Sequence, residues 1–250
     1  MKMRAMLRSF AVAVLGRQCV PRRILFGLAS GYRMWLSPAE NLSYLAGTAE
    51  PHLQRAIRRY VKYGATAYDI GANLGYVSLS LAKKVGANGR VFAFEPLPEN
   101  LEKLRKNIAL NKLKNVSIES SAVSDRTGRD VIRVAGNASM ASMAWHQHDP
   151  SAVEIAIQTI ALDELTESGR IPMPHFVKID VEGAEGMVLS GMRRTISTAR
   201  PVLFVECSDA GREFSWKLLS DLGYRCQSAI SEEHISNYES YRHSDFLWLP

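Results

Sequence analysis

Short apolar runs and longer runs with helical periodicity alternate along the chain from residue 64 onward. The short runs are rich in β-branched and aromatic residues, as buried strands are, and they cover residues 65–70, 90–95, 116–123, 175–180, 201–206, 224–229 and 245–249. Between them apolar residues recur every three or four positions, which predicts helices over 76–84, 99–111, 162–167, 184–196 and 213–222. Strands that alternate with crossover helices form a parallel sheet covered on both faces, so we predict an α/β fold.

The alternation is interrupted between residues 124 and 161. A predicted turn at 125–129 is followed by strands at 130–134 and 155–160, separated by a loop over 136–150 that is rich in Ser, Met and His. The chain has 250 residues, a length that one α/β domain with an N-terminal extension accounts for. We therefore expect a single main domain rather than an array of repeats.

The basic residues are concentrated ahead of the predicted sheet. Residues 1–63 contain eleven Lys and Arg but only Glu40 and Glu50 as acidic residues, a net charge of +9, whereas the remainder carries −3. Because the main domain has no basic excess, we do not expect it to bind nucleic acid. The apolar stretch 9–16 lies between Arg8 and Arg17 and is too short to span a membrane. We expect residues 1–43 to form a basic extension with a helix packed on the domain; contact with an anionic membrane is the less favoured alternative.

The cysteines restrict the class of protein further. Cys19, Cys207 and Cys226 are odd in number and widely spaced, without a Cys-x-x-Cys pair. This pattern argues against a disulfide scaffold, a zinc ribbon and a thioredoxin-like redox site. It suits a reducing compartment, and we expect a cytoplasmic protein.

A glycine-containing turn follows the first predicted strand. Gly71 allows a sharp turn out of the strand, and Gly75 allows a close approach at the start of the next helix. Glu95 ends the second strand, 24 residues after Gly71, where a carboxylate can accept hydrogen bonds from both hydroxyls of a ribose. Asp69 replaces the first glycine of the dinucleotide-binding fingerprint, and its charge would repel a phosphate but suit an ammonium group. A cofactor with an ammonium group, a ribose and an adenine is S-adenosylmethionine.

Charged residues are unusually dense at the end of the strand predicted over 175–180. Lys178, Asp180 and Glu182 lie on one side of an extended chain, and Glu185 follows in the next helix. Two interpretations remain open from these residues alone. They form either a reacting site or a buried ion pair that braces the sheet.

Taken in order, the motifs resemble the FkbM family of S-adenosylmethionine-dependent methyltransferases over residues 44–249. The matching segments are 47–51, 68–76, 92–96, 121–125, 159–163 and 177–185. The resemblance implies a class I methyltransferase domain over residues 44–250, with a Rossmann-like, mostly parallel, doubly wound sheet, an antiparallel final strand and an N-terminal helical extension. The implied reaction is O-methylation of a hydroxyl on a sugar, glycan or other natural product, so the expected partner is a small-molecule or saccharide acceptor.

The resemblance also assigns residues to roles. Its implied cofactor contacts are Asp69, Gly71, Ala72, Asn73, Gly75, Tyr76, Glu95, Pro96, Ser121 and Ala122. It implies Asp180 and Glu182 as catalytic candidates on the acceptor side, with no metal assigned.

Several alternatives stay open at this point. His146 and His148 are alternative bases, and a divalent metal could instead bind Asp180 with Glu182 or Glu206. Methylation of a nitrogen, a nicotinamide-dependent oxidoreductase on a similar sheet, and a non-catalytic binding module are the alternative functions.

Overall fold

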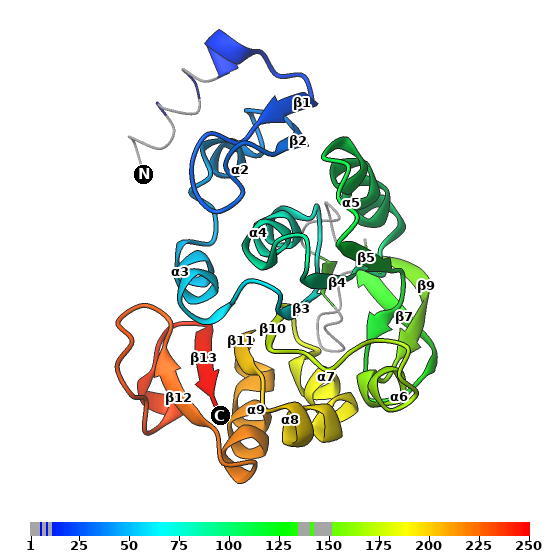
Figure 1. The fold of residues 1–250 in the computed structure, drawn as a ribbon, viewed down its shortest axis with the longest axis vertical. Coiled ribbons are helices and arrows are strands. Elements are labelled where there is room, and N and C mark those ends of the chain that lie inside the picture. Colours follow the sequence, from blue (N-terminus) through cyan, green and yellow to red (C-terminus); the bar gives the residue numbers. More distant parts are fainter. Residues whose placement is uncertain (1–5, 7–8, 10–11, 135–140, 143–151) are drawn as a thin grey trace.

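The computed structural model describes residues 6, 9, 12–134, 141–142 and 152–250, and a seven-stranded sheet forms its centre (Figure 1). The strands are β3 (Thr66–Ile70), β4 (Arg90–Phe94), β5 (Val116–Glu119), β10 (Phe176–Ile179), β11 (Val202–Glu206), β12 (Arg225–Ser228) and β13 (Asp245–Leu249). Their order across the sheet is β12-β13-β11-β10-β3-β4-β5. All pairs from β5 to β11 are parallel, whereas β13 runs antiparallel to both of its neighbours. The predicted mostly parallel sheet with an antiparallel final strand is therefore confirmed.

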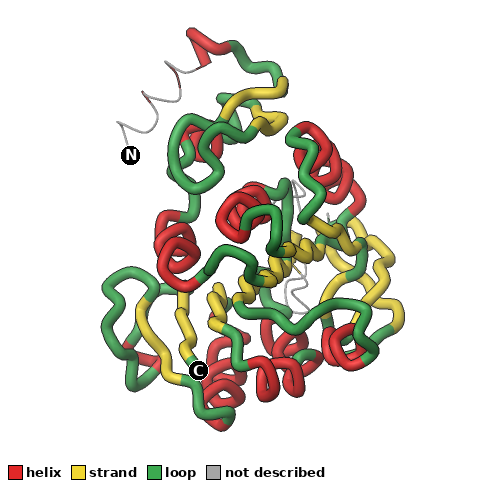
Figure 2. The backbone as a smooth tube through the Cα atoms, viewed as in Figure 1, coloured by secondary structure: helices red, strands yellow, loops and turns green. Residues whose placement is uncertain are grey.

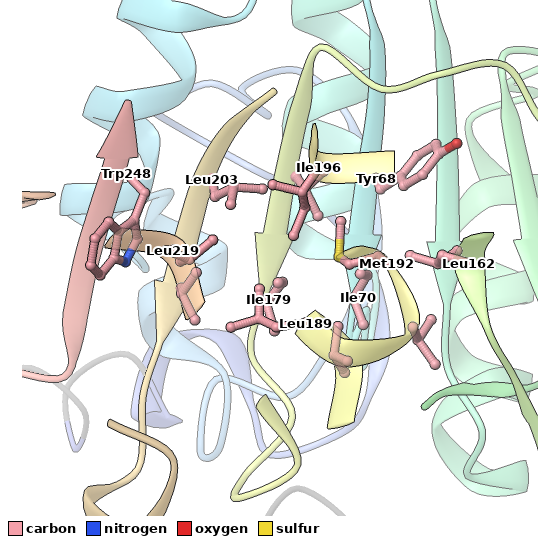
Figure 3. Close-up of a cluster of buried hydrophobic side chains, with 14 of the residues drawn as sticks. Tyr68, Ile70, Leu162, Ile179, Leu189, Met192, Ile196, Leu203, Leu219 and Trp248 are labelled. Atoms are coloured by element: carbon pink, nitrogen blue, oxygen red, sulfur yellow. The ribbon is translucent and has the colours of Figure 1, made fainter. Parts of the chain in front are cut away.

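Helices cover both faces of this sheet (Figures 1 and 2). One face is covered by α3 (Pro51–Tyr60), α4 (Tyr76–Val85) and α5 (Pro98–Leu110), and the other by α6 (Leu162–Glu167), α7 (Glu185–Gly191), α8 (Arg193–Ala199) and α9 (Asp209–Asp221). Period-two alternation sends Tyr68 and Ile70 of β3 to the α7–α9 side and Ala67 to the other. Figure 3 shows the resulting core, in which Leu189, Met192 and Leu219 pack on the sheet.

Two predicted elements are divided in the structure. The strand predicted over 116–123 is wrong as a single element, because the chain leaves the main sheet after β5 and pairs elsewhere as β6 (Ala122–Val123). The helix predicted over 184–196 is interrupted at Met192, between α7 and α8. At this interruption the backbone packs tightly, since a Cβ on Gly191 would lie 1.9 Å from the carbonyl oxygen of Ser124.

A second, smaller sheet is built from the segment that interrupts the alternation. It contains β6, β7 (Gly128–Val134), β8 (Ala141–Ser142) and β9 (Val153–Ile160), in the order β6-β9-β7-β8. Ala122 of β6, Ile132 of β7 and Ile157 of β9 share a small core with Leu97, which precedes α5. The small sheet therefore packs against the end of the main sheet where β4 finishes.

The N-terminal extension contains a β-hairpin that the sequence did not predict. Residues 12–15 are helical, and β1 (Val20–Arg23) then pairs antiparallel with β2 (Arg33–Leu36), before α2 (Leu42–Ala46). Met34 and Leu36 of β2 are fully buried in the core that contains Leu104 and Ile108 of α5. The hairpin is therefore packed on the main domain. Within the described residues, no helix is both long and apolar enough to cross a bilayer.

Two asparagines, Asn107 within α5 and Asn111 at its C-cap, complete the hydrogen bonding of the hairpin. The Oδ1 atoms of Asn107 and Asn111 accept hydrogen bonds from the backbone N–H groups of Trp35 and Arg33, both at 2.8 Å. Four residues along a helix span about 6 Å, close to the span of two residues along a strand, about 6.7 Å. The two side chains therefore match the spacing of the free N–H groups on β2.

Candidate active site

A cavity of about 290 Å³ lies at the carboxyl ends of β3, β4, β10 and β11, where open α/β sheets bind ligands. Seven of the twelve residues predicted for the site line it: Gly71, Asn73, Glu95, Pro96, Ala122, Asp180 and Glu182. Its apolar lining includes Ile70, Phe94, Leu97, Val123 and Ile132. The cavity thus combines an apolar wall from the two sheets with a small number of polar groups.

The turn after β3 forms one side of the cavity. Gly71 has a φ of +76°, and its N–H donates to the carbonyl of Phe94 at 3.1 Å. A Cβ at Gly71 would lie 1.8 Å from the carbonyl oxygen of Asp180, so the turns after β3 and β10 pack together without room for a side chain. Asn73 also has a positive φ, of 49°, and its buried Oδ1 has no hydrogen-bond partner. That oxygen is available to a ligand donor.

Glu95 presents a carboxylate from the end of β4. Its Oε2 accepts the N–H of Asn73 at 2.8 Å and its Oε1 accepts the N–H of Leu97 at 3.0 Å. Burial raises the pKa of Glu95, and these two backbone donors offset part of that rise. The Asn100 side chain also hydrogen-bonds this carboxylate, and since each carboxylate oxygen can accept more than one hydrogen bond, the fixed side chain retains capacity for a ligand hydroxyl.

Lys178 links the cavity to the interior of the sheet. Its Nζ lies 3.4 Å from Oδ1 of Asp69 and 3.3 Å from Oδ2 of Asp180, and it donates to the carbonyls of Ile70 and Gly71 at 3.2 and 2.6 Å. Burial alone would lower the pKa of Lys178, but the two carboxylates outweigh it and raise that pKa. The lysine is therefore a permanent cation that fixes the turn after β3 and orients Asp180. Lys178 therefore takes part in both arrangements that the sequence leaves open: it braces the sheet through Asp69, and it contacts Asp180 at the cavity.

Asp69 does not line the cavity. Its side chain is fully buried, and Oδ2 accepts a hydrogen bond from Ser78 Oγ at 2.5 Å while Oδ1 faces Lys178. Strand alternation turns the side chain of Asp69 toward α4. The direct contact with a ligand ammonium expected from the sequence stays a prediction. Asp69 acts in this structure by pairing with Lys178.

Four other predicted cofactor contacts are not among the residues that line the cavity: Ala72, Gly75, Tyr76 and Ser121. Gly75 caps the N-terminus of α4, and a Cβ there would lie 2.5 Å from Cδ1 of Leu104 in α5, so its smallness serves helix packing. The Tyr76 ring stacks on Tyr44 with centroids 4.9 Å apart, and its hydroxyl accepts a hydrogen bond from Gln54. Tyr76 thereby supports Tyr44, which does line the cavity.

Carboxylates gather on the side of the cavity away from Glu95's hydrogen-bonded turn. Glu50, Asp180, Glu182 and Glu206 all line it. Burial, followed by the charges of Asp180 and Asp245, raises the pKa of Glu206 to about 7. Burial and then Asp180 also raise the pKa values of Glu50 and Glu182. Glu50, Glu182 and Glu206 therefore hold protons more readily than free carboxyl groups do.

Sequence reasoning missed two lining residues from the N-terminal part, Tyr44 and Glu50. Glu50 stands in the matched segment 47–51, so a signal was present, but nothing in the sequence placed that segment over the sheet. The sequence alone suggests Glu206 only as a possible metal ligand. Glu185 is buried outside the lining, where it accepts hydrogen bonds from the N–H of Gly183 at 2.9 Å and from the hydroxyl of Ser208 at 3.0 Å. It holds the start of α9 in place, because Ser208 is the N-cap of that helix.

The described residues bear on the alternative of a bound metal but not on the alternative of a histidine base. Across residues 12–134 and 152–250, with the few other described positions, no group of three or more His, Cys, Asp and Glu side chains has the arrangement of a metal site. His146 and His148 lie outside the described residues.

The lining fits S-adenosylmethionine. Glu95 offers an acceptor for a ribose hydroxyl, the buried Oδ1 of Asn73 lacks a partner, and the apolar wall suits a flat adenine ring. The acidic side chains on the side of the cavity away from Glu95 are also compatible with a cationic sulfonium.

A family model described as the methyltransferase FkbM domain matches residues 69–226. The chain is 30% identical over 165 residues to the hexuronic acid methyltransferase AglP of Haloferax volcanii, covering 62% of this chain and 61% of that protein. It is 27% identical over 139 residues to a protein-L-isoaspartate O-methyltransferase of Caenorhabditis elegans, covering 54% of this chain and 59% of that protein. The chain thus spans about three fifths of the length of each relative.

A solved structure supports the fold. The FkbM methyltransferase from Methylobacillus flagellatus aligns with a TM-score of 0.50 at 19% identity, covering 74% of this chain and 43% of that one. At this identity the likeness concerns the fold, which is the class I methyltransferase arrangement.

Proposed function

Because the chain belongs to the FkbM family of methyltransferases, we propose that it transfers a methyl group from S-adenosylmethionine to an oxygen of a sugar or glycan acceptor. One observation carries the proposal. A single cavity at the carboxyl edge of the sheet has the fixed carboxylate of Glu95 on one side and the group formed by Glu50, Asp180, Glu182 and Glu206 on the other. The first side suits the cofactor and the second suits an acceptor with several hydroxyl donors.

When bound, S-adenosylmethionine supplies a methyl group already activated by its positively charged sulfur. Glu95 would hold the ribose hydroxyls, and the turn of Gly71 and Asn73 would bind the amino-acid end. The remaining work of the protein is to orient the acceptor and to remove one proton. Orientation of two reactants contributes up to roughly 7–11 kcal/mol to lowering a barrier. We therefore expect the fixed positions of the turns after β3 and β10 to contribute to the rate.

Asp180 is the group we assign to the acceptor proton. Its side chain is 34% exposed and lines the cavity, and Nζ of Lys178 lies 3.3 Å from its Oδ2. The free oxygen can accept a hydrogen bond from an acceptor hydroxyl and take its proton as the new bond forms. General bases of this kind contribute about 10²–10⁴-fold to rate. Glu182 and Glu206 lie in the same wall and would accept hydrogen bonds from neighbouring hydroxyls.

The name of one relative supports a sugar acceptor, since AglP is a hexuronic acid methyltransferase. The acidic wall supports it as well, because ionised carboxylates accept hydrogen bonds from sugar hydroxyls and protonated carboxyl groups can also donate to them. Both observations favour an acceptor with many hydroxyls over an aromatic or peptide acceptor.

The cofactor half of the proposal is tested by calorimetry with S-adenosylhomocysteine. We expect binding to the wild type and at least tenfold weaker binding to Glu95→Ala, since a charge-assisted hydrogen bond contributes roughly 1.5–3 kcal/mol. Glu99→Ala, an exposed change at the start of α5, is the matched control and should bind as the wild type does. Unchanged affinity in a folded Glu95→Ala protein, or preferential binding of NADH, would contradict the assignment.

The acceptor half is tested by transfer of a labelled methyl group to a panel of neutral sugars, amino sugars and uronic acids. Mass spectrometry of the products separates oxygen from nitrogen methylation. With the acceptor that reacts, Asp180→Asn should lower turnover about 10²-fold or more while leaving S-adenosylhomocysteine affinity nearly unchanged. Full turnover by this variant would make Asp180 a structural brace, and methylation of amino groups alone would reject the oxygen acceptor.

A further inference from the structure

The N-terminal segment exposes large apolar side chains. Of the ten such side chains exposed among the described residues, six belong to the first 36 positions: Met6, Val14, Leu15, Leu25, Phe26 and Trp35. Phe26 is 67% exposed and Leu25 is 56% exposed, both in the loop that follows β1. Figure 1 shows this hairpin at the opposite end of the molecule from β12 and α9. The exposed apolar side chains are therefore gathered at one end of the molecule.

The same segment is basic without acidic compensation. Residues 1–36 contain seven Lys and Arg and no Asp or Glu. Arg17, Arg23 and Arg33 are exposed, and no ion pair to a carboxylate forms at any of them within the described part of the chain. Their positive charge is therefore free to act on a partner.

The register of the hairpin places both kinds of side chain on one face. Trp35 pairs with Pro21 and Arg33 pairs with Arg23, and directly opposed residues of an antiparallel pair share a face. The buried Met34 lies between Arg33 and Trp35 and points to the core, so these two point outward. The outward face of the hairpin thus carries a tryptophan beside two arginines.

A basic hollow continues this face. A cavity of about 620 Å³ is lined by four cationic side chains, Lys83, Arg90, Lys112 and Lys114, and by no Asp or Glu. Tyr32, next to Arg33, belongs to the same lining, and Lys83 lies over its ring at 5.9 Å. Arg90 begins β4, so the hollow lies at the amino edge of the sheet, opposite to the edge that holds Glu95.

We propose that the hairpin face, defined as Arg23, Leu25, Phe26, Arg33 and Trp35, together with the basic hollow, docks the protein on an anionic membrane surface. Aliphatic and aromatic side chains flanked by arginines are the pattern of an interfacial anchor, in which the apolar groups enter the headgroup region and the cations face the lipid phosphates. Binding of a nucleic acid would account for the exposed cations but not for the exposed Leu25. The inference is independent of the reaction proposed above.

Vesicle sedimentation with the full chain tests this docking. We expect binding to vesicles of phosphatidylcholine mixed with phosphatidylglycerol, little binding to phosphatidylcholine alone, and weaker binding at high salt. The pair Arg23→Gln and Arg33→Gln should reduce partitioning about 25-fold, since each basic side chain near an anionic surface contributes about fivefold. The pair Leu25→Ser and Phe26→Ser should reduce it at least tenfold.

Matched controls come from the far end of the molecule. Phe214→Ser removes an exposed aromatic ring of α9, and the pair Arg225→Gln and Arg242→Gln removes two exposed charges. These variants should sediment with vesicles as the wild type does, and all variants should retain thermal stability and S-adenosylhomocysteine affinity.

Three results would overturn the proposal. The first is no binding to anionic vesicles, and the second is an equal loss of vesicle binding in the control variants. The third is that the hairpin substitutions leave vesicle binding unchanged and instead convert a dimer to a monomer or abolish binding to a polynucleotide.

Discussion

Glu206 shows how the cavity alters the chemistry of a single residue. Its carboxyl group ends β11 among Asp180, Asp245, Glu50 and Glu182, and burial together with these charges raises its pKa from 4.5 to about 7. A carboxyl group whose pKa is higher in the folded than in the unfolded protein holds its proton more tightly when folded. Its contribution to stability is therefore complete below pH 4.5 and is lost as the pH rises through about 7.

We accordingly predict a pH-dependent gain in stability from Glu206→Gln. Near pH 5 the variant and the wild type should unfold at similar urea concentrations, and at pH 8 the variant should be more stable by about 1–2 kcal/mol, a value reduced for solvent screening of a partly exposed group. Urea unfolding at intervals between pH 5 and 8.5 measures this. The exposed change Glu213→Gln should give a difference that does not vary with pH, and the same behaviour in Glu206→Gln would contradict the prediction.

At the scale of elements, the contact between the turns after β3 and β10 determines the shape of the site. Gly71 and Gly64 both have a φ near +80°, but only Gly71 faces another backbone, since a Cβ at Gly64 would meet nothing within 4 Å. A substitution at Gly64 therefore measures the free-energy cost of the left-handed conformation alone, whereas one at Gly71 adds the cost of a steric clash.

We predict that Gly64→Ala lowers the free energy of unfolding by about 1 kcal/mol and leaves S-adenosylhomocysteine affinity unchanged. Gly71→Ala should cost roughly 1–3 kcal/mol more, because the added carbon forces the turns apart, and it should weaken binding at least tenfold. Urea unfolding and calorimetry on both variants give the comparison. Equal effects at the two positions would show that the turn after β3 is only a connector.

The elements that could be predicted from sequence are those with a strong local pattern. The turn from Gly71 to Gly75, the Glu95 position and the parallel strands are encoded by periodicity and by short motifs. The hairpin is different, because β2 has four residues and its N–H groups are bonded by Asn107 and Asn111, more than 70 positions away. The interruption between α7 and α8 likewise depends on contact with distant Ser124.

The same distinction applies to the site. Sequence motifs predicted which residue types gather at the carboxyl edge, and seven of those residues line the cavity. They did not predict that Asp69 turns away to pair with Lys178, or that Glu50 closes the cavity from the N-terminal segment. Both depend on packing between elements rather than on local sequence.

For the whole molecule, the cavity joins turns from β3, β4 and β10 with the small sheet and the N-terminal segment. Tyr44 and Glu50 reach it from the segment that also packs the hairpin against α5. A ligand bound there contacts parts of the chain that are far apart in sequence. Binding should therefore stabilise the complete fold rather than one loop.

S-adenosylhomocysteine at a hundredfold excess over its dissociation constant should add about 2.7 kcal/mol to stability. For a chain of this size we expect the midpoint of thermal unfolding to rise by roughly 5–10 °C. Differential scanning calorimetry with and without the ligand measures the shift, and NADH at the same concentration is the comparison. A midpoint unaffected by S-adenosylhomocysteine, or raised equally by NADH, would contradict the assigned cofactor.

The small sheet has an evolutionary consequence. Its strands come from one uninterrupted stretch of chain, from β6 to β9, and that stretch supplies Ala122, Val123 and Ile132 to the cavity, whereas Glu95 and Gly71 come from the main sheet. Recombination between relatives could exchange this stretch as a cassette, and the exchange would replace part of the apolar wall while the turns that carry Gly71 and Glu95 are inherited unchanged. Chimeras with junctions at its two ends would therefore vary one wall of the cavity against a constant set of turns from the main sheet.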